Sequence, residues 1–308
     1  MRPDRRAVLL LAAGVPAVAA GCSREPEPRA RLRLATGEAG GAYEVLGQRF
    51  AGELRRRGLA AQVLRTAASV ENLAMLAEGR AELGFALADS ADRAVRAGHP
   101  KVAALARMYM NYVHLVVPAG SPVGAVADLA GRRVSIGAAL SGTAVTAERV
   151  LAAARLTAPA RTVTLGLDAS MKALRDGDVA AFFWSGGVPT PALDAFARTT
   201  PVRLLALDGL VAPLRRAYGP VYEDAAVPAG EYGRGVPVAT VGTPSYLVCR
   251  ASLSGDVAFA VTRILFASRD RLEAPDAPGG RLDRRYAIGT GAVPLHPGAV
   301  RYYRSTYG

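Results

Sequence analysis

Hydrophobic and polar residues alternate along the chain with two periods, one typical of β-strands and one typical of α-helices. Leu46, Phe50 and Leu54 recur at every fourth position, which places them on one face of a helix. The first part of the pattern predicts strands over 31–36, 61–67 and 81–89 and helices over 42–58 and 69–79. Regular alternation of strands and helices predicts an α/β fold with largely parallel sheets.

Two long extended stretches, 102–118 and 233–250, interrupt this alternation. We interpret 109–118 and 236–250 as two crossings between a first α/β unit and a second unit inserted into it. The second unit is predicted to contain strands over 132–138, 162–166, 179–186 and 202–207 and helices over 143–156, 169–177 and 191–199. After the second crossing, the pattern predicts a long helix over 254–272 and a terminal helix over 296–308.

The predicted fold is therefore α/β, with two lobes joined by two hinge crossings. We predict that lobe I comprises residues 29–115 and 245–308, and that lobe II comprises residues 116–244. Two lobes connected in this way form a clamp that closes on a small molecule.

The first thirty residues have the composition of an export signal. A basic start is followed by the apolar residues 7–20, which are too few to span a bilayer comfortably, and then by AAGC. Small residues directly before Cys22 are typical of a lipoprotein signal peptide over 1–21, so we predict a lipidated Cys22 and a spacer over 22–30. The body would then be extracytoplasmic and anchored to the cell membrane. The alternative is an ordinary secretory peptide with an unmodified cysteine.

Composition changes this picture little. The 308 residues carry a formal net charge of +12, but lysine occurs only at Lys101 and Lys172 and basic residues form no concentrated run. We therefore expect no nucleic-acid partner, and the charge favours an anionic ligand or surface only weakly. Cys249 is the one cysteine besides Cys22, so lipidation of Cys22 leaves no disulfide, and we interpret Cys249 as a buried structural thiol.

Four loops lie where a predicted strand ends and a helix begins. They are GEAGGAY at 37–43, AASVEN at 67–72, AALSGT at 138–143 and SGGVPTP at 185–191. In open α/β sheets, ligands bind at this edge. The four loops are therefore the candidate binding site.

The first loop matches neither a dinucleotide fingerprint nor a P-loop, because its glycine spacing differs and no G-K-[ST] follows. The backbone around Gly41, with the N–H groups of Ala42 and Tyr43 at a helix start, suits an anion. Glu38 in the same loop would repel one. Our hypothesis is a zwitterionic ligand whose ammonium approaches Glu38. The alternative is that Glu38 points outward and pairs with an arginine.

The other loops add hydroxyl and amide groups at helix starts. Ser69 by itself is best explained as a helix cap. Asn72 lies one helical turn after Ser69 and is a candidate ligand contact. Capping is also the alternative for Thr143, and a core position is the alternative for Trp184. The predicted ligand-binding residues are Glu38, Gly41, Ala42, Tyr43, Ser69, Val70, Asn72, Asp89, Ser141, Gly142, Thr143, Trp184, Gly187, Val188 and Pro189.

Constellations typical of enzymes do not stand out in the sequence. His99, His114 and His296 are scattered, and H-x-x-x-H, C-x-x-C and G-x-S-x-G are all missing. We therefore predict no catalytic residue, no metal site and no cofactor.

Several segments taken in order resemble one known family, the TAXI (TRAP-associated extracytoplasmic immunogenic) solute receptors. The resemblance rests on ATGEAGGAYEVLG, SVENLAMLAEGRAELGFALAD, LAGRRVSIGAALSGTAVTAERVL, AAFFWSGGVPTPAL and PLHPGAVRYY. It implies a type II periplasmic-binding-protein fold and capture of a small organic anion, often glutamate or a dicarboxylate, for an ion-driven permease. The sequence departs from the family at Glu38, Ala39 and Ala42, and again at Ala86 and Ala88, which leaves the ligand open.

The leading prediction is a monomeric, lipid-anchored substrate-binding protein that is not an enzyme. It would capture a glutamate-like or dicarboxylate anion, or a zwitterionic amino acid, for a TRAP membrane permease. One alternative is a ligand-binding sensory module of a surface receptor. A less favoured alternative is an enzyme on the same fold.

Overall fold

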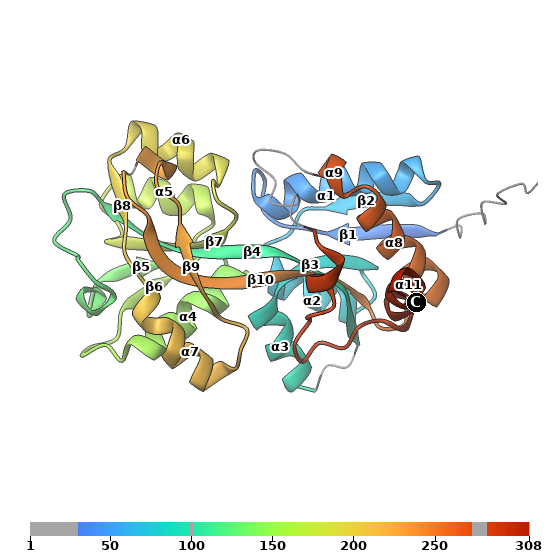
Figure 1. Ribbon diagram of the computed structural model, residues 1–308. Coiled ribbons are helices and arrows are strands. Elements are labelled where there is room, and N and C mark those ends of the chain that lie inside the picture. The colour runs from blue at the N-terminus through green and yellow to red at the C-terminus, as the bar shows by residue number, and fades with distance from the viewer. Residues whose placement is uncertain (1–29, 99–100, 234, 273–281, 308) are drawn as a thin grey trace, which may run out of the picture.

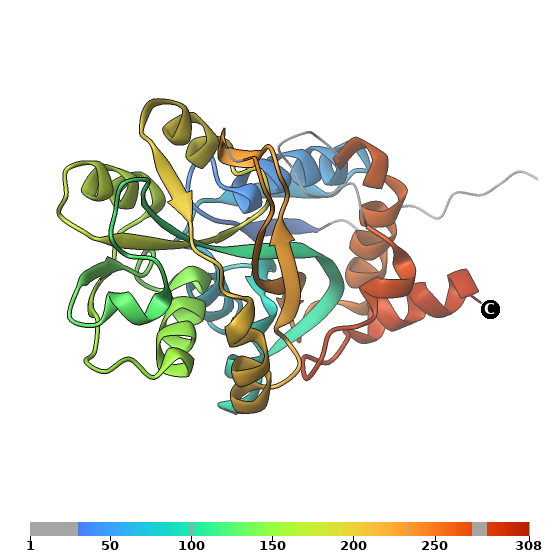
Figure 2. The ribbon, with the colours of Figure 1, turned by 60° about the vertical axis from the view of Figure 1, so that its left-hand side comes forward.

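The computed structural model describes residues 30–98, 101–233, 235–272 and 282–307, which form two α/β lobes (Figure 1). Two long strands, β4 (Val102–Pro118) and β10 (Val238–Arg250), run through both lobes. In the turned view of Figure 2, helices lie on both sides of the strands. The predicted signal peptide, Cys22 and most of the predicted spacer lie outside the described residues.

Lobe I is formed by the chain before β4 and after β10. Its elements are β1 (Arg31–Ala35), α1 (Ala42–Arg56), β2 (Ala60–Leu64), α2 (Ser69–Ala77), β3 (Leu83–Leu87), α3 (Ala88–Arg96), α8 (Gly255–Ala267), α9 (Arg269–Leu272), α10 (Arg284–Ala287) and α11 (Pro297–Tyr307). Lobe II is formed by the chain between β4 and β10. Its elements are η1 (Val126–Leu129), β5 (Arg133–Ser135), α4 (Gly142–Ala154), β6 (Arg161–Val163), α5 (Leu167–Arg175), β7 (Ala181–Gly186), α6 (Pro191–Thr199), β8 (Val202–Leu204), η2 (Asp208–Leu210), α7 (Val211–Tyr218), β9 (Glu223–Val227) and η3 (Glu231–Gly233).

The strands are hydrogen-bonded in the order β2-β1-β3-β10-β4-β7-β5-β6, with β8 on β4 and β9 on β10. Each lobe contains a parallel trio in which the first strand lies between the second and the third: β2-β1-β3 in lobe I and β6-β5-β7 in lobe II. β10 is antiparallel to all three strands that pair with it, β3, β4 and β9. The predicted fold class, two α/β lobes joined by two crossing strands, is confirmed.

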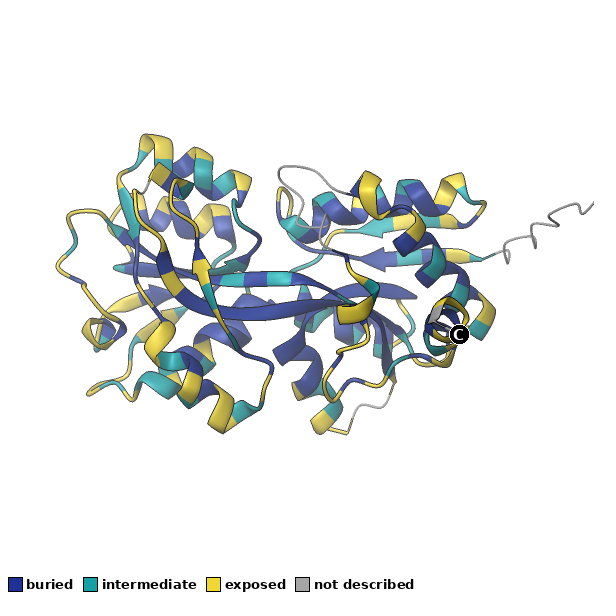
Figure 3. Cartoon of the chain, viewed as in Figure 1, coloured by how far each residue is buried: buried dark blue, intermediate teal, exposed yellow. Residues whose placement is uncertain are grey.

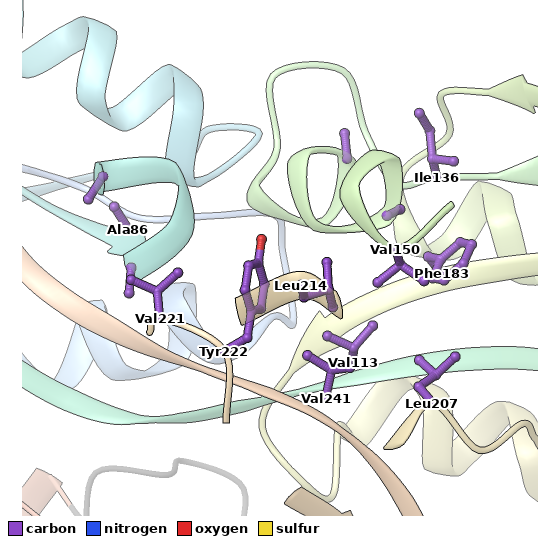
Figure 4. Packing of buried hydrophobic residues seen from close by; sticks show 14 of the residues in the cluster. Ala86, Val113, Ile136, Val150, Phe183, Leu207, Leu214, Val221, Tyr222 and Val241 are labelled. Atoms are coloured by element: carbon purple, nitrogen blue, oxygen red, sulfur yellow. The ribbon is translucent and has the colours of Figure 1, made fainter. Parts of the chain in front are cut away.

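The buried core continues from one lobe into the other. One apolar cluster includes Ala86 of β3, Val113 of β4 and Phe183 of β7. Figure 4 shows this cluster around the crossing strands, and Figure 3 shows both strands buried along most of their length. Burial of apolar surface at about 25 cal/mol per Å² therefore stabilises the junction between the lobes as well as each lobe.

The structure corrects three predicted elements of lobe I. The strand predicted over 81–89 ends at Leu87, and α3, which the sequence pattern did not show, begins at the next residue. The helix predicted over 254–272 is interrupted at Ser268, whose hydroxyl donates to the carbonyl of Ile264 at 2.6 Å. A serine that bonds to the preceding turn competes with the helical backbone pattern. Ser69 is the first residue of α2, and the cap position belongs to Ala68.

In lobe II, α7 and β9 were not predicted from the sequence. Cys249 is fully buried in β10, as predicted, and burial raises the pKa of its thiol. The predicted lobe boundaries, at 115/116 and 244/245, fall inside the two crossing strands. We retain them as a proposal for where the hinge bends.

Candidate functional site

A small cavity lies between the lobes at the carboxyl ends of the parallel strands. Its walls come from all four predicted loops and from β4, and its volume is about 40 Å³. The lining residues are Gly37, Glu38, Gly41, Ala42, Tyr43, Ala67, Ala68, Ser69, Leu87, Asn111, Ala138, Ser141, Gly142, Thr143, Trp184, Ser185 and Gly186. A single water molecule needs about 10–15 Å³ of such space. A cavity of this volume therefore holds only a small molecule.

The start of α4 in lobe II lies against the start of α2 and the end of β3 in lobe I. A Cβ atom on Gly142 would collide with Ser69 Oγ and with the side chain of Leu87, so the helix start of lobe II requires glycine here. Next to it, Leu140 adopts a left-handed conformation with φ of 62°. Its carbonyl accepts the N–H groups of Val70 and Glu71, each at 3.1 Å. The amino end of α2 is therefore occupied by lobe II and is not free for a ligand.

Three hydroxyl groups on the cavity wall already accept backbone hydrogen bonds. Ser69 Oγ accepts from Leu87 N at 3.0 Å and Ser141 Oγ accepts from Ala144 N at 3.0 Å. Thr143 Oγ1 accepts from Ser185 N at 3.2 Å. A hydroxyl that accepts from the backbone keeps its own proton for another partner. These side chains are thus fixed in place as hydrogen-bond donors.

Three further polar side chains on the wall have buried atoms without a hydrogen-bond partner among the described residues. These atoms are Tyr43 OH, Asn111 Nδ2 and Ser185 Oγ. Burial raises the pKa of Tyr43 well above its usual range, so its hydroxyl stays protonated. A buried donor left unpaired costs about 1–3 kcal/mol. Three such atoms around one cavity therefore indicate a missing partner that accepts hydrogen bonds.

Two helices begin at the cavity wall, α1 at Ala42 and α4 at Gly142. The first N–H groups of a helix have no partner inside the helix and carry the positive end of its dipole. Among the lining residues that the structure describes, Glu38 alone is charged. The site therefore combines neutral donors and helix starts with a single carboxylate, an arrangement that suits an anion bound without an arginine or a lysine.

Glu38 reaches across the cleft to the other lobe. Its Oε2 accepts the N–H of Leu167, the first residue of α5, at 3.0 Å. The structure therefore differs from the alternative in which Glu38 points outward and pairs with an arginine. The physical reason is that the unpaired N–H and the positive dipole end of α5 attract the carboxylate.

Nine of the predicted ligand-binding residues line the cavity: Glu38, Gly41, Ala42, Tyr43, Ser69, Ser141, Gly142, Thr143 and Trp184. Trp184 is only partly buried, and its Nε1 donates to Thr190 Oγ1 at 2.9 Å. Trp184 also packs against an apolar cluster of lobe II, so it lies both at the cavity wall and at the edge of the core.

Six predicted residues do not line the cavity: Val70, Asn72, Asp89, Gly187, Val188 and Pro189. The amide of Asn72 donates to the carbonyls of Thr36 and Phe85 at 2.6 and 2.8 Å, and its oxygen accepts from Thr66 Oγ1 at 2.6 Å. Asn72 therefore ties together strands and loops of lobe I, and its hydrogen-bonding groups are already occupied.

Asp89 is fully buried and joins the lobes away from the cavity. Its Oδ2 accepts from Thr146 Oγ1 at 2.7 Å and from Tyr222 OH at 2.9 Å, and both donors belong to lobe II. Arg149 donates to the same Tyr222 hydroxyl at 3.1 Å. Figure 4 shows Tyr222 extending from the apolar cluster with its hydroxyl at the tip. Asp89 and its two donors form the interlobe latch.

Sequence reasoning missed Asn111 and Ser185 as wall residues. Asn111 lies in β4, in a stretch that the pattern identified only as a crossing, and its polar side chain within an apolar strand was the available signal. Ser185 stands at the start of the fourth loop beside Trp184. No group of three or more potential metal ligands occurs in the described parts of the chain. Within those parts, no helix is long and apolar enough to cross a membrane.

The sequence was compared with models of protein families. A model described as the NMT1-like family matches residues 34–306, which is most of the chain. The chain belongs to the NMT1-like family. The match to the NMT1-like family covers both lobes and all the lining residues of the cavity. The finer assignment to the TAXI receptors stays a prediction.

Solved structures similar to this NMT1-like protein share its fold. The alkanesulfonate-binding protein SsuA from Xanthomonas axonopodis pv. citri, bound to MOPS, has a TM-score of 0.53 and 20% identity, over 90% of this chain and 84% of that one. A Bordetella bronchiseptica RB50 protein has a TM-score of 0.55, 16% identity and 89% coverage of both chains. An ancestral arginine-binding protein bound to arginine has a TM-score of 0.52 and 13% identity, over 79% and 96%. The fold is that of the periplasmic binding proteins.

Proposed function

We propose that this protein is an extracytoplasmic solute-binding protein that captures a small organic anion between its lobes and delivers it to a membrane transporter. The observation that carries the proposal is the set of unpaired donors on the cavity wall, namely Tyr43, Asn111 and Ser185. A carboxylate or sulfonate offers only acceptors and forms strong hydrogen bonds with such donors. The sulfonate ligand named for one structural neighbour is consistent with this class, and the arginine named for another shares only its carboxylate group with it.

The finer part of the proposal concerns the transporter and the anchor. The motif resemblance to TAXI receptors supports a TRAP-type permease as the partner, and the small residues directly before Cys22 support a lipid anchor there. The sequence motifs also led us to expect a glutamate-like molecule or a dicarboxylate. Reconstitution of uptake in vesicles containing a TRAP-type permease from the same organism would test the partner: uptake should require both proteins. Uptake that is unchanged when the binding protein is omitted would contradict it.

The ligand class can be tested on the purified protein. Denaturation followed by mass spectrometry of the released molecules should give one small organic acid in an amount comparable to the protein. The protein is then refolded without the acid, and calorimetry should show that the acid binds when it is added back. The mass of the acid should be unchanged after long incubation with the protein. Release of a cation or a neutral sugar would contradict the proposal, and conversion of the acid into a product would favour the enzyme alternative.

A second prediction concerns Cys22, which lies outside the described residues. Protein isolated from its native membrane should begin at Cys22 and carry diacylglycerol there, because small residues directly precede this cysteine at the end of the apolar segment. Mass spectrometry of the intact protein and of its amino-terminal peptide measures both. A mature chain that starts elsewhere and carries no lipid would contradict the anchor.

The sensory alternative shares the cavity and differs in its partner. It predicts that ligand changes the activity of a membrane receptor and that transport proceeds without the protein. A histidine kinase gene, rather than a permease gene, beside this gene would favour it.

A further inference from the structure

We propose that Glu38 is a built-in second carboxylate, which makes the site selective for ligands with a single acid group. The inference rests on the proposed function as a receptor for small organic anions. It narrows the ligand class expected from the sequence, because a dicarboxylate or glutamate would bring a second acid group into a site where the protein already supplies one.

The first step is the position of Glu38. Two kinds of anion-attracting groups lie near the cavity: the unpaired donors and helix starts of its wall, and the amino end of α5, which Glu38 contacts from the wall. The N–H of Leu167 at that amino end is occupied by Glu38 Oε2 at 3.0 Å. The carboxylate also lies against Gly166, where an added Cβ atom would be 2.9 Å from Glu38 Oε1. The carboxylate thus fills the space at the start of α5.

The second step is the part of the wall left without a partner. Asn111 is 2% exposed and Tyr43 is 8% exposed; both residues line the same cavity as Glu38, and each has a buried donor atom without a partner. One acid group of a ligand satisfies these donors. In a cavity of about 40 Å³, a second acid group would lie close to Glu38, and two negative charges at short range repel each other.

The third step is size. The cavity volume of about 40 Å³ leaves room for an acid group and a short chain. The Glu38 carboxylate is satisfied by α5, so a ligand ammonium beside it is not required. The same bond links lobe I to lobe II, because Glu38 belongs to the first loop of lobe I and Leu167 to lobe II. Selection for one acid group and closure of the clamp therefore use the same carboxylate.

Calorimetry with straight-chain monocarboxylates of two to five carbons, and with dicarboxylates of the same lengths, tests the inference. The unchanged protein should bind at least one monocarboxylate about tenfold or more tightly than the dicarboxylate of equal length. In Glu38→Ala, which empties the start of α5, and in Glu38→Gln, which keeps the shape without the charge, this ratio should shift by about tenfold or more toward the dicarboxylate.

Asp168→Asn is the matched control. Asp168 is exposed in the first turn of the same helix and does not line the cavity, so its loss should leave the ratio unchanged. A dicarboxylate that binds the unchanged protein as tightly as its monocarboxylate, or a ratio that is the same in both Glu38 variants, would overturn the inference and leave the proposed function standing. Binding of none of these acids, together with release of no organic acid from the denatured protein, would instead contradict the proposed function itself.

Discussion

Replacement of Asn111 by leucine should weaken binding of the ligand by about 10- to 150-fold and should raise the melting temperature of the ligand-free protein. The loss of affinity follows from removing one hydrogen bond to a charged ligand, which contributes about 1.5–3 kcal/mol. The gain in stability follows because Asn111 Nδ2 is buried without a partner in this structure, and an unpaired buried donor costs about 1–3 kcal/mol. Calorimetry of binding and thermal unfolding measure the two effects.

Thr243→Val is the matched control for Asn111. Thr243 is the cross-strand neighbour of Asn111 on β10, its hydroxyl is also buried without a partner among the described residues, and it does not line the cavity. We expect a similar gain in stability with unchanged affinity. Wild-type affinity in the leucine variant would exclude Asn111 from the site, whereas a loss of affinity in both variants would indicate a general effect on the crossing strands.

Replacement of Asp89 by asparagine should open the clamp. The interlobe latch places two hydroxyl donors of lobe II on one carboxylate oxygen, and an amide has one acceptor atom and no charge. Hydrogen bonds to charged groups contribute about 1.5–3 kcal/mol each, so the closed arrangement should lose about tenfold or more in population. Small-angle scattering of the ligand-free variant should show a larger radius of gyration, and ligand affinity should fall.

Asp92→Asn provides the comparison for the latch. Asp92 lies on the same helix, is 3% exposed, and forms its ion pair with Arg96 of that helix. The variant therefore loses a carboxylate from α3 without losing a contact with lobe II. We expect scattering and affinity like those of the unchanged protein. Identical scattering profiles for Asp89→Asn and the unchanged protein, with equal affinity, would show that the latch does not hold the lobes together.

The alternation of hydrophobic and polar residues predicted the layers of this fold well. The two crossing strands, the parallel strands and the helices that follow the four loops all appear where the local pattern places them. α3 was missed because Ala88 and Asp89 continue a buried stretch, and nothing local separates a strand end from a helix start there. Helix α3 is stabilised by packing against the other elements, and such contacts are not visible in a single segment of sequence.

The loops that form the candidate site could be predicted from the sequence, but the contacts between distant segments that complete it could not. The backbone at Gly41 and the hydroxyls of Ser141 and Thr143 follow from helix starts at strand ends, which are local features. Asn111 and the contact of Glu38 with α5 depend on how two lobes meet, and those residues are far apart in the sequence. Asn72 was predicted to contact the ligand and does not line the cavity, because its amide is occupied by carbonyls of distant segments.

The position of β10 has a consequence for the order in which the chain folds. Among the described residues, β10 is the last strand in the sequence, yet it lies between β3 and β4 in the sheet. Until residues 238–250 have been synthesised, β3 lacks its antiparallel neighbour and presents an open edge, which is prone to pair with other chains. Contacts between segments so distant in the chain form slowly. Lobe I therefore cannot complete its sheet before lobe II has been made, and during this interval the unfinished edge of β3 needs protection from aggregation.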